Sequence, residues 1–285
     1  MFSIIVCSIN PQNVQTLKQS IEATATMPFE MIVFDNRQSG IGICQVYNQC
    51  AERAKYDYLC FVHEDIIFHT QGWDKILATK LSEADCGVIG FAGGTAKYPY
   101  LYGWQNISTF CQKHYLRGDG KTTSLRSSKN RGDFSEVVTL DGMCLCVSKD
   151  TWSKHRFDQT TFTGFHSYDT DFTTALFVAG RKNYVCHSAV VEHRSTGSFS
   201  TSWLESVKIY LNKWGSHLPL YVTDTHSKSQ ICRKEAAVEA YAIKKLISNR
   251  LISKSEAVDA INNFRRRHPY SLHTLPLLIK LKKLR

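Results

Sequence analysis

Three short apolar runs, separated by helical patterns, set the fold class of this chain. Residues 3–9, 31–34 and 59–62 each contain an uninterrupted apolar stretch of strand length. Uninterrupted apolar character is typical of strands covered on both faces, as in parallel sheets. Between these runs, apolar residues recur at helical spacing. The order strand, helix, strand, helix, strand predicts an α/β fold with a mostly parallel sheet flanked by helices.

The rest of the chain divides into less regular parts. Asn10 before Pro11 marks the start of the first helix, as an N-cap residue followed by proline. Residues 93–135 lack a regular pattern, and a loop of that length is usually functional or disordered. We therefore expect a nucleotide-binding half (1–92), an acceptor half (93–218) and a helical, basic C-terminal extension (219–285). Further strands are expected at 88–91, 136–140, 144–148, 184–186 and 189–191, with helices at 73–84, 168–179 and 203–214.

The positive charge of the chain is concentrated near its C-terminus. The net charge is +10, and residues 244–285 carry eleven Lys or Arg against two acidic residues. Such a segment suits an anionic membrane surface or a nucleic acid. A nucleic acid is not expected, because the rest of the chain is nearly neutral and shows no base-stacking motif.

The last residues have the pattern of an interfacial helix. Leu277, Leu278, Leu281 and Leu284 fall on one side of a helix, with lysines around them. That pattern is typical of a helix lying on an anionic membrane. The alternative is a helix that packs on its own domain and exposes its lysines to solvent.

The sequence favours a cytoplasmic protein, with this segment peripheral on the inner face of the membrane. It contains no run of about 18 apolar residues, which a spanning helix would need. Its first residues have no basic region and are expected to form a strand rather than a signal peptide. The ten cysteines form no C-x-x-C pair, so buried reduced thiols are expected.

The third apolar run ends in an acidic cluster, His63-Glu64-Asp65. Carboxylates at the end of a buried strand are costly unless they meet a cation or hydrogen-bond donors. Strand ends are also where open α/β sheets bind ligands, and Mg²⁺ or Mn²⁺ takes oxygen ligands that it shares with phosphates. The cluster therefore indicates a metal and phosphate site, whereas the alternative is a polar turn into solvent.

Four segments in this order resemble a GT-A glycosyltransferase, similar to family 2 enzymes and their bacterial relatives. They are the opening strand and turn, a second strand with a terminal acid, the strand with the metal motif, and an acidic motif before a helix. The resemblance covers about three-quarters of the chain. The segments are Ser3–Asn10, Ile32–Asn36, Phe61–Ile66 and Tyr168–Phe172, the last followed by Gly180.

The resemblance implies a role for particular residues. Asp65 matches the main metal ligand of the family, and we expect His193 as a second ligand. His63 departs from the family, which has an aspartate there, and we assign it to donor binding with metal ligation as an alternative. Residues expected to bind the nucleotide donor are Ser8, Asn10, Asp35, Asn48, His63 and Glu64.

Asp169 is the expected catalytic base, because an acceptor hydroxyl must lose a proton as it attacks the sugar. Asp171 should point elsewhere. The alternatives are plain structural roles: a helix-terminal carboxylate for Asp169, a surface histidine after a strand for His193, and a strand-end turn for Asp35.

The function expected from the resemblance is an inverting, metal-dependent glycosyltransferase. It would move a sugar from a nucleotide donor, most simply a UDP-sugar, to a glycan or lipid-linked acceptor, as in cell-surface polysaccharide synthesis. The expected cofactor is Mn²⁺ or Mg²⁺. The alternative is a non-catalytic sugar-nucleotide or glycan-binding protein on the same fold.

Overall fold

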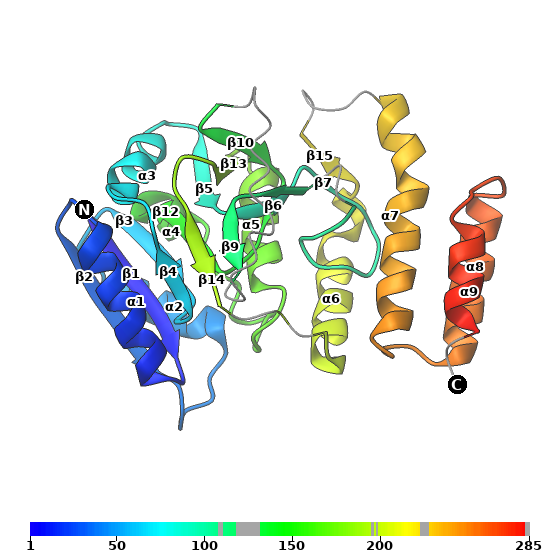
Figure 1. Cartoon of the computed structure of the whole chain (residues 1–285), viewed down its shortest axis with the longest axis horizontal. Coiled ribbons are helices and arrows are strands. Elements are labelled where there is room, and N and C mark those ends of the chain that lie inside the picture. Colours follow the sequence, from blue (N-terminus) through cyan, green and yellow to red (C-terminus); the bar gives the residue numbers. More distant parts are fainter. Residues whose placement is uncertain (108–110, 118–131, 195–196, 198, 223–227, 283–285) are drawn as a thin grey trace.

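A seven-stranded sheet forms the centre of the molecule, in the order β10-β13-β5-β12-β3-β1-β2 (Figure 1). The computed structural model describes residues 1–107, 111–117, 132–194, 197, 199–222 and 228–282. In this sheet, β12 and β10 run opposite to the other strands, so the predicted mostly parallel α/β architecture is confirmed. The strands are β1 (Phe2–Ser8), β2 (Phe29–Asp35), β3 (Tyr58–Val62), β5 (Cys86–Gly90), β10 (Phe134–Val137), β12 (Cys144–Ser148) and β13 (Lys182–Cys186).

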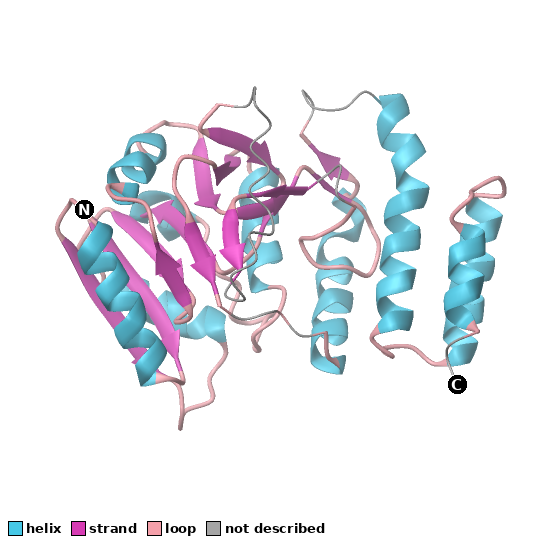
Figure 2. Ribbon diagram, viewed as in Figure 1, coloured by secondary structure: helices cyan, strands magenta, loops and turns pink. Residues whose placement is uncertain are grey.

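Helices cover both faces of this sheet, which explains the uninterrupted apolar runs. Residues of α1 (Pro11–Thr24) and α3 (Trp73–Leu81) belong to the core cluster on one face. A second cluster, on the other face, contains residues of α2 (Ile43–Arg53), α4 (Lys149–Lys154), α5 (Tyr168–Val178) and α6 (Thr201–Trp214). Figure 2 shows the sheet between these helices.

The strand order creates a natural binding position. Strand β1 pairs with β2 on one side and with β3 on the other, all three in parallel. The connections therefore diverge between β1 and β3, and ligands of open α/β sheets bind outside the carboxyl ends of strands at such a point. The residues at these ends are Ser8 of β1 and His63-Glu64-Asp65 after β3.

Short accessory strands surround the carboxyl ends of the main sheet. One small sheet joins β14 (Val191–His193) to β4 (Ile66–Phe68) and to β9 (Tyr115–Arg117). The strand predicted at 189–191 is thus displaced toward His193, which ends β14. The other small sheets are β11 (Thr139–Leu140) with β6 (Ala92–Gly94) and β8 (Cys111–Lys113), and β15 (Leu220–Tyr221) with β7 (Ala96–Lys97).

The strand predicted at 136–140 is two strands. Residues up to Val137 pair with β13 as β10, whereas Thr139 and Leu140 pair with β6 as β11. Between them, the Val138 N–H donates to the Gly94 carbonyl. The chain therefore changes sheets within one apolar run, a change that an apolar pattern does not reveal.

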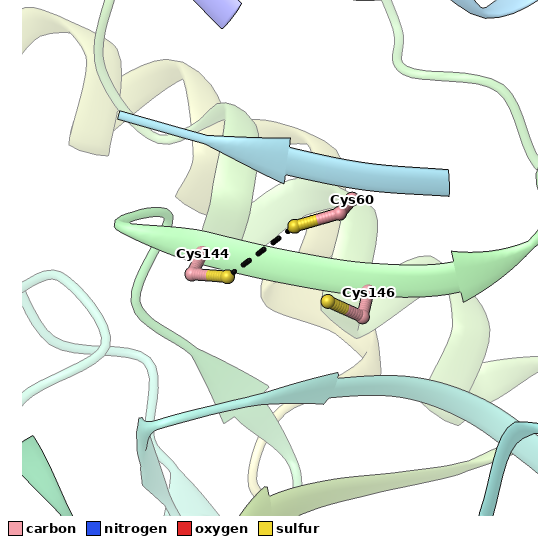
Figure 3. A group of neighbouring side chains, drawn as sticks. All are labelled: Cys60, Cys144 and Cys146. Atoms are coloured by element: carbon pink, nitrogen blue, oxygen red, sulfur yellow. Dashed lines mark hydrogen bonds between the residues drawn. The ribbon is translucent and has the colours of Figure 1, made fainter. Parts of the chain in front are cut away.

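Three buried cysteines lie together in the centre of the sheet (Figure 3). Cys60 on β3 is paired in register with Cys146 on β12, and its sulfur lies 3.7 Å from that of Cys144. The nine cysteines whose side chains the structure describes are free thiols. The three side chains fill the core as small apolar groups, in keeping with the expected buried thiols.

The C-terminal helices pack on the body of the protein, so residues 219–285 are not a detached extension. Strand β15 pairs with β7, across the boundary predicted at residue 218. Val238 and Ala242 of α7 (Lys228–Ser248) pack against Tyr98 and Tyr102. Helices α8 (Lys254–Arg267) and α9 (Thr274–Leu281) then pack against α7 (Figure 1).

The apolar side predicted for the last helix faces inward rather than toward a membrane. Leu277 is buried, and Leu278 and Leu281 pack against the same cluster of α7 and α8 residues. Leu284 lies outside the described residues. The alternative of a helix packed on its own domain therefore describes α9 better. None of the described helices has the length and apolar character needed to span a bilayer.

Candidate active site

Two histidines and an aspartate converge beside the end of β3. The ligand atoms of His63, Asp65 and His193 all lie within 4.8 Å of one another. His193 reaches Asp65 because β14 pairs with β4, and the Arg194 N–H donates to the Asp65 carbonyl. The His193 Nε2 lies 3.5 Å from the Asp65 carboxylate, with both side chains largely buried. The predicted pair Asp65 and His193 is thus brought together, with His63 as a third member.

The ring of His63 is held by a hydrogen bond with Tyr168. Its Nε2 lies 2.8 Å from the Tyr168 hydroxyl, which lies 3.2 Å from the Gly142 carbonyl. With the Tyr168 proton on the Gly142 carbonyl, the Nε2 of His63 donates to Tyr168 and its Nδ1 accepts; in the other tautomer, Tyr168 donates to the Nε2. Burial first, and then the charge of His193, lower the pKa of His63 and favour the neutral ring.

These three side chains fit a divalent cation. Neutral imidazoles and a carboxylate are ligands that Mn²⁺ and related ions accept, and three protein ligands leave positions for phosphate oxygens. The hydroxyl of Tyr168 fixes the His63 ring from behind, as outer partners of metal-bound histidines commonly do. His63 therefore suits metal ligation, the alternative to its assigned role in donor binding.

Asp169 is the second residue of α5 and faces the same pocket. One carboxylate oxygen accepts the Gly142 N–H at 2.9 Å, and the other accepts the Thr170 N–H at 2.7 Å. Burial, and then the nearby Asp141 carboxylate, raise the pKa of Asp169 to about 7. A carboxylate with such a pKa can take up a proton near neutral pH, as a general base must.

Gly142 has to be glycine for this arrangement. A Cβ at this position would lie 2.2 Å from the Tyr168 hydroxyl oxygen and 3.0 Å from the Cβ of Asp169. Gly142 therefore lets α5 approach closely enough for Tyr168 to reach His63.

Asp171 points away from the pocket, as expected. Its Oδ1 accepts a 2.7 Å hydrogen bond from the indole of Trp214 and lies 2.8 Å from the Lys213 ammonium. Only 4% of its side chain is exposed. Asp171 thus fixes α5 to the end of α6, while Asp169 faces the cavity.

At the β1–β3 switch point, Glu64 closes the turn after β1. Its Oε2 accepts from the Ser8 hydroxyl at 2.5 Å and from the Asn10 N–H at 2.9 Å. The Asn10 side chain caps α1 by accepting the Gln12 N–H at 3.0 Å. Ser8, Asn10 and Glu64, all predicted to bind donor, are thus together and preorganised, although their contacts are with one another.

Asp35 lies beside Ser8 at the open end of the sheet. The two residues are register partners at the ends of β2 and β1. Hydrogen bonds from the Arg37 guanidinium lower the pKa of Asp35 to about 2, so its carboxylate is ionised. Asp35 is exposed, in a position where a nucleoside could replace Arg37 as its partner.

Asn48 is separate from these residues. Its amide donates to the Phe157 carbonyl at 2.8 Å and to Gln159 at 2.9 Å, and its oxygen accepts from the Trp152 indole at 3.3 Å. It is buried and ties α2 to α4 and the segment after it. The polar atoms of Asn48 are thus occupied by structural hydrogen bonds rather than turned toward the site.

A pocket of about 720 Å³ joins the two histidines of the metal-capable group to Asp169. His63, His193 and Asp169 line it, together with Tyr168 and Asp141. The chain also contributes residues that the sequence did not single out, because nothing in their local pattern connects them to a site. These lining residues are Trp104, Lys113, Arg117, Phe165, His166, Trp203, Tyr241 and Lys245.

Residues 3–214 match the model of the "Glycosyltransferase like family". The chain belongs to the glycosyltransferase-like family. Because the match contains β1, the end of β3, and α5, the metal-capable group and Asp169 both lie within the family region. A search of curated protein sequences finds no match for this glycosyltransferase.

One solved structure supports the GT-A fold of this chain. The chain is similar to a crystal structure of GalNAc-T7 with UDP, GalNAc and Mn²⁺, with a TM-score of 0.54 and 11% sequence identity. The match covers 94% of the present chain and 55% of that chain, so the glycosyltransferase spans about half the length of this neighbour. A weaker likeness is to A197 from STIV, with a TM-score of 0.39, 15% identity, and coverage of 68% of this chain and 86% of that one.

Proposed function

We propose that this glycosyltransferase is a metal-assisted, inverting enzyme that transfers a sugar from a nucleotide donor to a glycan or lipid-linked acceptor. A UDP-sugar is the proposed donor, and cell-surface polysaccharide synthesis is the proposed setting. The observation that carries the proposal is that His63 and His193, which group with Asp65, line one pocket with Asp169. The similar GalNAc-T7 structure contains UDP and Mn²⁺, which supports the same donor chemistry.

Each residue has a distinct task in this mechanism. His63, Asp65 and His193 would hold Mn²⁺ or Mg²⁺. Bound there, the ion supplies positive charge for the diphosphate that leaves. Asp35 would accept from the nucleoside, while Glu64 keeps the turn from Ser8 to Asn10 in place.

Asp169 would take the proton of the attacking hydroxyl. Its two carboxylate oxygens are held by the Gly142 and Thr170 N–H groups, so its orientation is fixed before the acceptor arrives. A base aimed at the acceptor, on the side opposite the leaving diphosphate, produces inversion at the anomeric carbon by a single displacement. Asp141 is the neighbouring carboxylate in the pocket and holds the Met143 N–H at 2.9 Å.

A panel of sugar nucleotides tests this proposal. Nucleotide release is measured with Mn²⁺, with Mg²⁺ and with a chelator, for the wild type and for Asp65→Asn. We expect release from a UDP-sugar that depends on metal and falls at least tenfold in the variant. If no sugar nucleotide releases its nucleotide, the proposed transferase activity is contradicted. If Asp65→Asn releases nucleotide as fast as the wild type, the metal assignment of Asp65 is contradicted. The anomeric configuration of the product, read by NMR, tests inversion.

The observation that suggested a non-catalytic protein no longer favours that alternative. That alternative rested on His63 standing where the family has an aspartate. A ring nitrogen of His63 lies within 4.8 Å of the ligand atoms of Asp65 and His193, so an imidazole at this position suits the same task. The replacement therefore gives no reason to expect a loss of metal binding.

We also propose a cytoplasmic protein that attaches to an anionic bilayer through the corner between α8 and α9. This corner comprises Tyr270, Leu272, Leu275 and Ile279, which are 97%, 91%, 66% and 50% exposed. Arg265 and Arg266 are exposed at the end of α8 beside it. Exposed apolar residues next to cationic ones suit an anionic bilayer surface. The proposed contact therefore differs from the leucine face expected from the sequence, which is buried.

A further inference from the structure

The wall of the pocket formed by the C-terminal helices is aromatic and basic. Trp203 of α6 and Tyr241 of α7 line it, together with Trp104 from the segment before β8. Lys113 at the end of β8 and Lys245 of α7 line it as well. The proposed mechanism gives none of these side chains a task, although they occupy the same cavity as Asp169.

The position of Lys245 is set by its helix. Tyr241 and Lys245 are four residues apart on α7, so they share one face of the helix. Val238 and Ala242 fix α7 against Tyr98 and Tyr102, and Leu246 fixes it against α6. The neighbouring Lys244 is exposed. The packing of α7 thus directs Lys245 into the pocket and Lys244 into solvent.

The two pocket lysines lie against aromatic rings and close to each other. The Lys245 ammonium lies 4.5 Å from the ring centre of Phe199, and that of Lys113 lies 5.4 Å from the ring of Trp104. Burial and then the charge of Lys113 lower the pKa of Lys245. Within the described part of the chain, no carboxylate lies within ion-pair distance of Lys245. A half-buried ammonium without a carboxylate partner, as at Lys245, favours an anion in the pocket.

We propose that this wall is an acceptor subsite for a sugar that carries an anionic group, either a carboxylate or a phosphate. The rings of Trp104, Trp203 and Tyr241 would contact the apolar faces of the sugar, and the lysines would bind its charge. This inference rests on the proposed function, because it assigns a class of acceptor to the same pocket.

The location of the wall favours the acceptor over the donor diphosphate. The predicted donor residues Ser8 and Asp35 end β1 and β2. Helix α7 lies on the side of α6 that faces away from these strands (Figure 1). Arg117, the register partner of His193, is the cation beside the metal-capable group and is better placed for the diphosphate than Lys245.

Two variants of adjacent lysines test the subsite. Lys245→Met keeps the apolar stem of the side chain and removes the charge in the pocket, and Lys244→Met removes the same charge from the solvent side. Wild type and both variants, loaded with UDP and Mn²⁺, are applied to a glycan array that carries neutral, uronic-acid, sialic-acid and phosphorylated glycans. The affinity for UDP is measured separately by calorimetry.

We expect the wild type to prefer acidic glycans, and Lys245→Met to lose about tenfold in their binding, as for one lost ion pair in a partly desolvated site. Lys244→Met should bind like the wild type. Carboxylated and phosphorylated glycans are separate arms, so the array also shows which anion is bound. Exclusive binding of neutral glycans, no glycan binding, or equal acidic-glycan binding by Lys245→Met would overturn the subsite.

The affinity for UDP separates the subsite from the proposed function. If Lys245→Met weakens UDP binding tenfold, the lysine belongs to the donor site, and the subsite is overturned while the transferase proposal stands. If the wild type binds no UDP, the donor assignment fails, and the array still decides whether acidic glycans bind through Lys245.

Discussion

The Nε2 of His63 and the hydroxyl of Tyr168 are joined by a 2.8 Å hydrogen bond, although 105 residues separate them in the chain. Tyr168 begins α5, and the next residue is the proposed base Asp169. One end of one helix thus orients the proposed metal ligand His63 and presents the proposed base. The proposed metal site and the proposed base are therefore positioned by the same residue pair at the start of α5, Tyr168 and Asp169.

Replacing Tyr168 by phenylalanine should weaken Mn²⁺ binding by about tenfold to a hundredfold, the usual range for outer partners of metal-bound histidines. The ring of His63 would lose the hydroxyl that orients it. Calorimetric titration with Mn²⁺ measures the effect. Tyr210→Phe is the matched control, because it removes a buried hydroxyl that bonds Thr174 of the same helix α5. Unchanged Mn²⁺ affinity in Tyr168→Phe would contradict the role of this hydroxyl.

Replacing Asp169 by asparagine should reduce the transfer rate by about 10²- to 10⁴-fold, the usual loss for a general base. Affinity for UDP should stay near the wild-type value, because the base acts on the acceptor in the transition state. Asp171→Asn is the control. It should lower the melting temperature by weakening the Lys213 contact, with near-normal transfer per folded molecule. The assignment is wrong if Asp171→Asn is the more damaging for transfer.

The transfer rate of the wild type should rise with pH, reach half of its maximum near pH 7 and level off about one pH unit higher. The pKa of Asp169 is raised to about 7 by burial and by Asp141, and the base acts only when ionised. Activity is therefore lost as pH falls through the folded-state pKa. Initial rates measured at saturating donor across this range give the profile. A rate independent of pH between about 5 and 8 would argue against Asp169 as the base.

Replacing Asp35 by alanine should weaken UDP binding about tenfold, the cost of one hydrogen bond to a charged group. The melting temperature should change little, since Asp35 and Arg37 form an exposed pair at the sheet edge. Asp150→Ala, which removes the exposed partner of Lys154, is the control for losing a surface carboxylate. A lowered melting temperature with full UDP affinity would favour the strand-end turn.

Replacing both Leu272 and Leu275 by glutamate should abolish binding to phosphatidylserine vesicles at low salt, because the change removes apolar contact and adds repulsion. Vesicle co-sedimentation measures binding. Val178→Glu, at an exposed apolar position at the end of α5, is the control and should bind like the wild type. Full vesicle binding by the double variant would show that this corner is not the contact.

The sequence predicts the parts of the fold that local pattern determines. The first three strands, the N-cap at Asn10 and the start of α5 at Tyr168 follow from apolar runs and turn residues, and the structure confirms them. The division of residues 136–140 between two sheets does not follow, because which strand each half pairs with is decided by the distant β13 and β6.

The site could be predicted only where residue type carries the chemistry. Asp65 and Asp169 can be identified in the sequence because they are carboxylates at the end of a strand and the start of a helix, and His193 because histidine is a common metal ligand. Lys245 cannot be identified in this way, because the sequence does not distinguish it from its neighbour Lys244. Glu64 and Asn48 stand out only as polar residues near the strands. Their hydrogen bonds depend on backbone groups and on segments that only folding brings close.

Helix α7 carries Lys245 into the pocket and also supports the α8–α9 pair through Ala240 and Ile243. The surface proposed to contact the bilayer and the wall proposed to bind the acceptor are thus both attached to helix α7, which acts as one rigid rod. If the acceptor is lipid-linked, enzyme and acceptor would find each other by diffusion in a plane rather than in a volume. The tilt of that rod would then set the height above the headgroups at which a sugar is added.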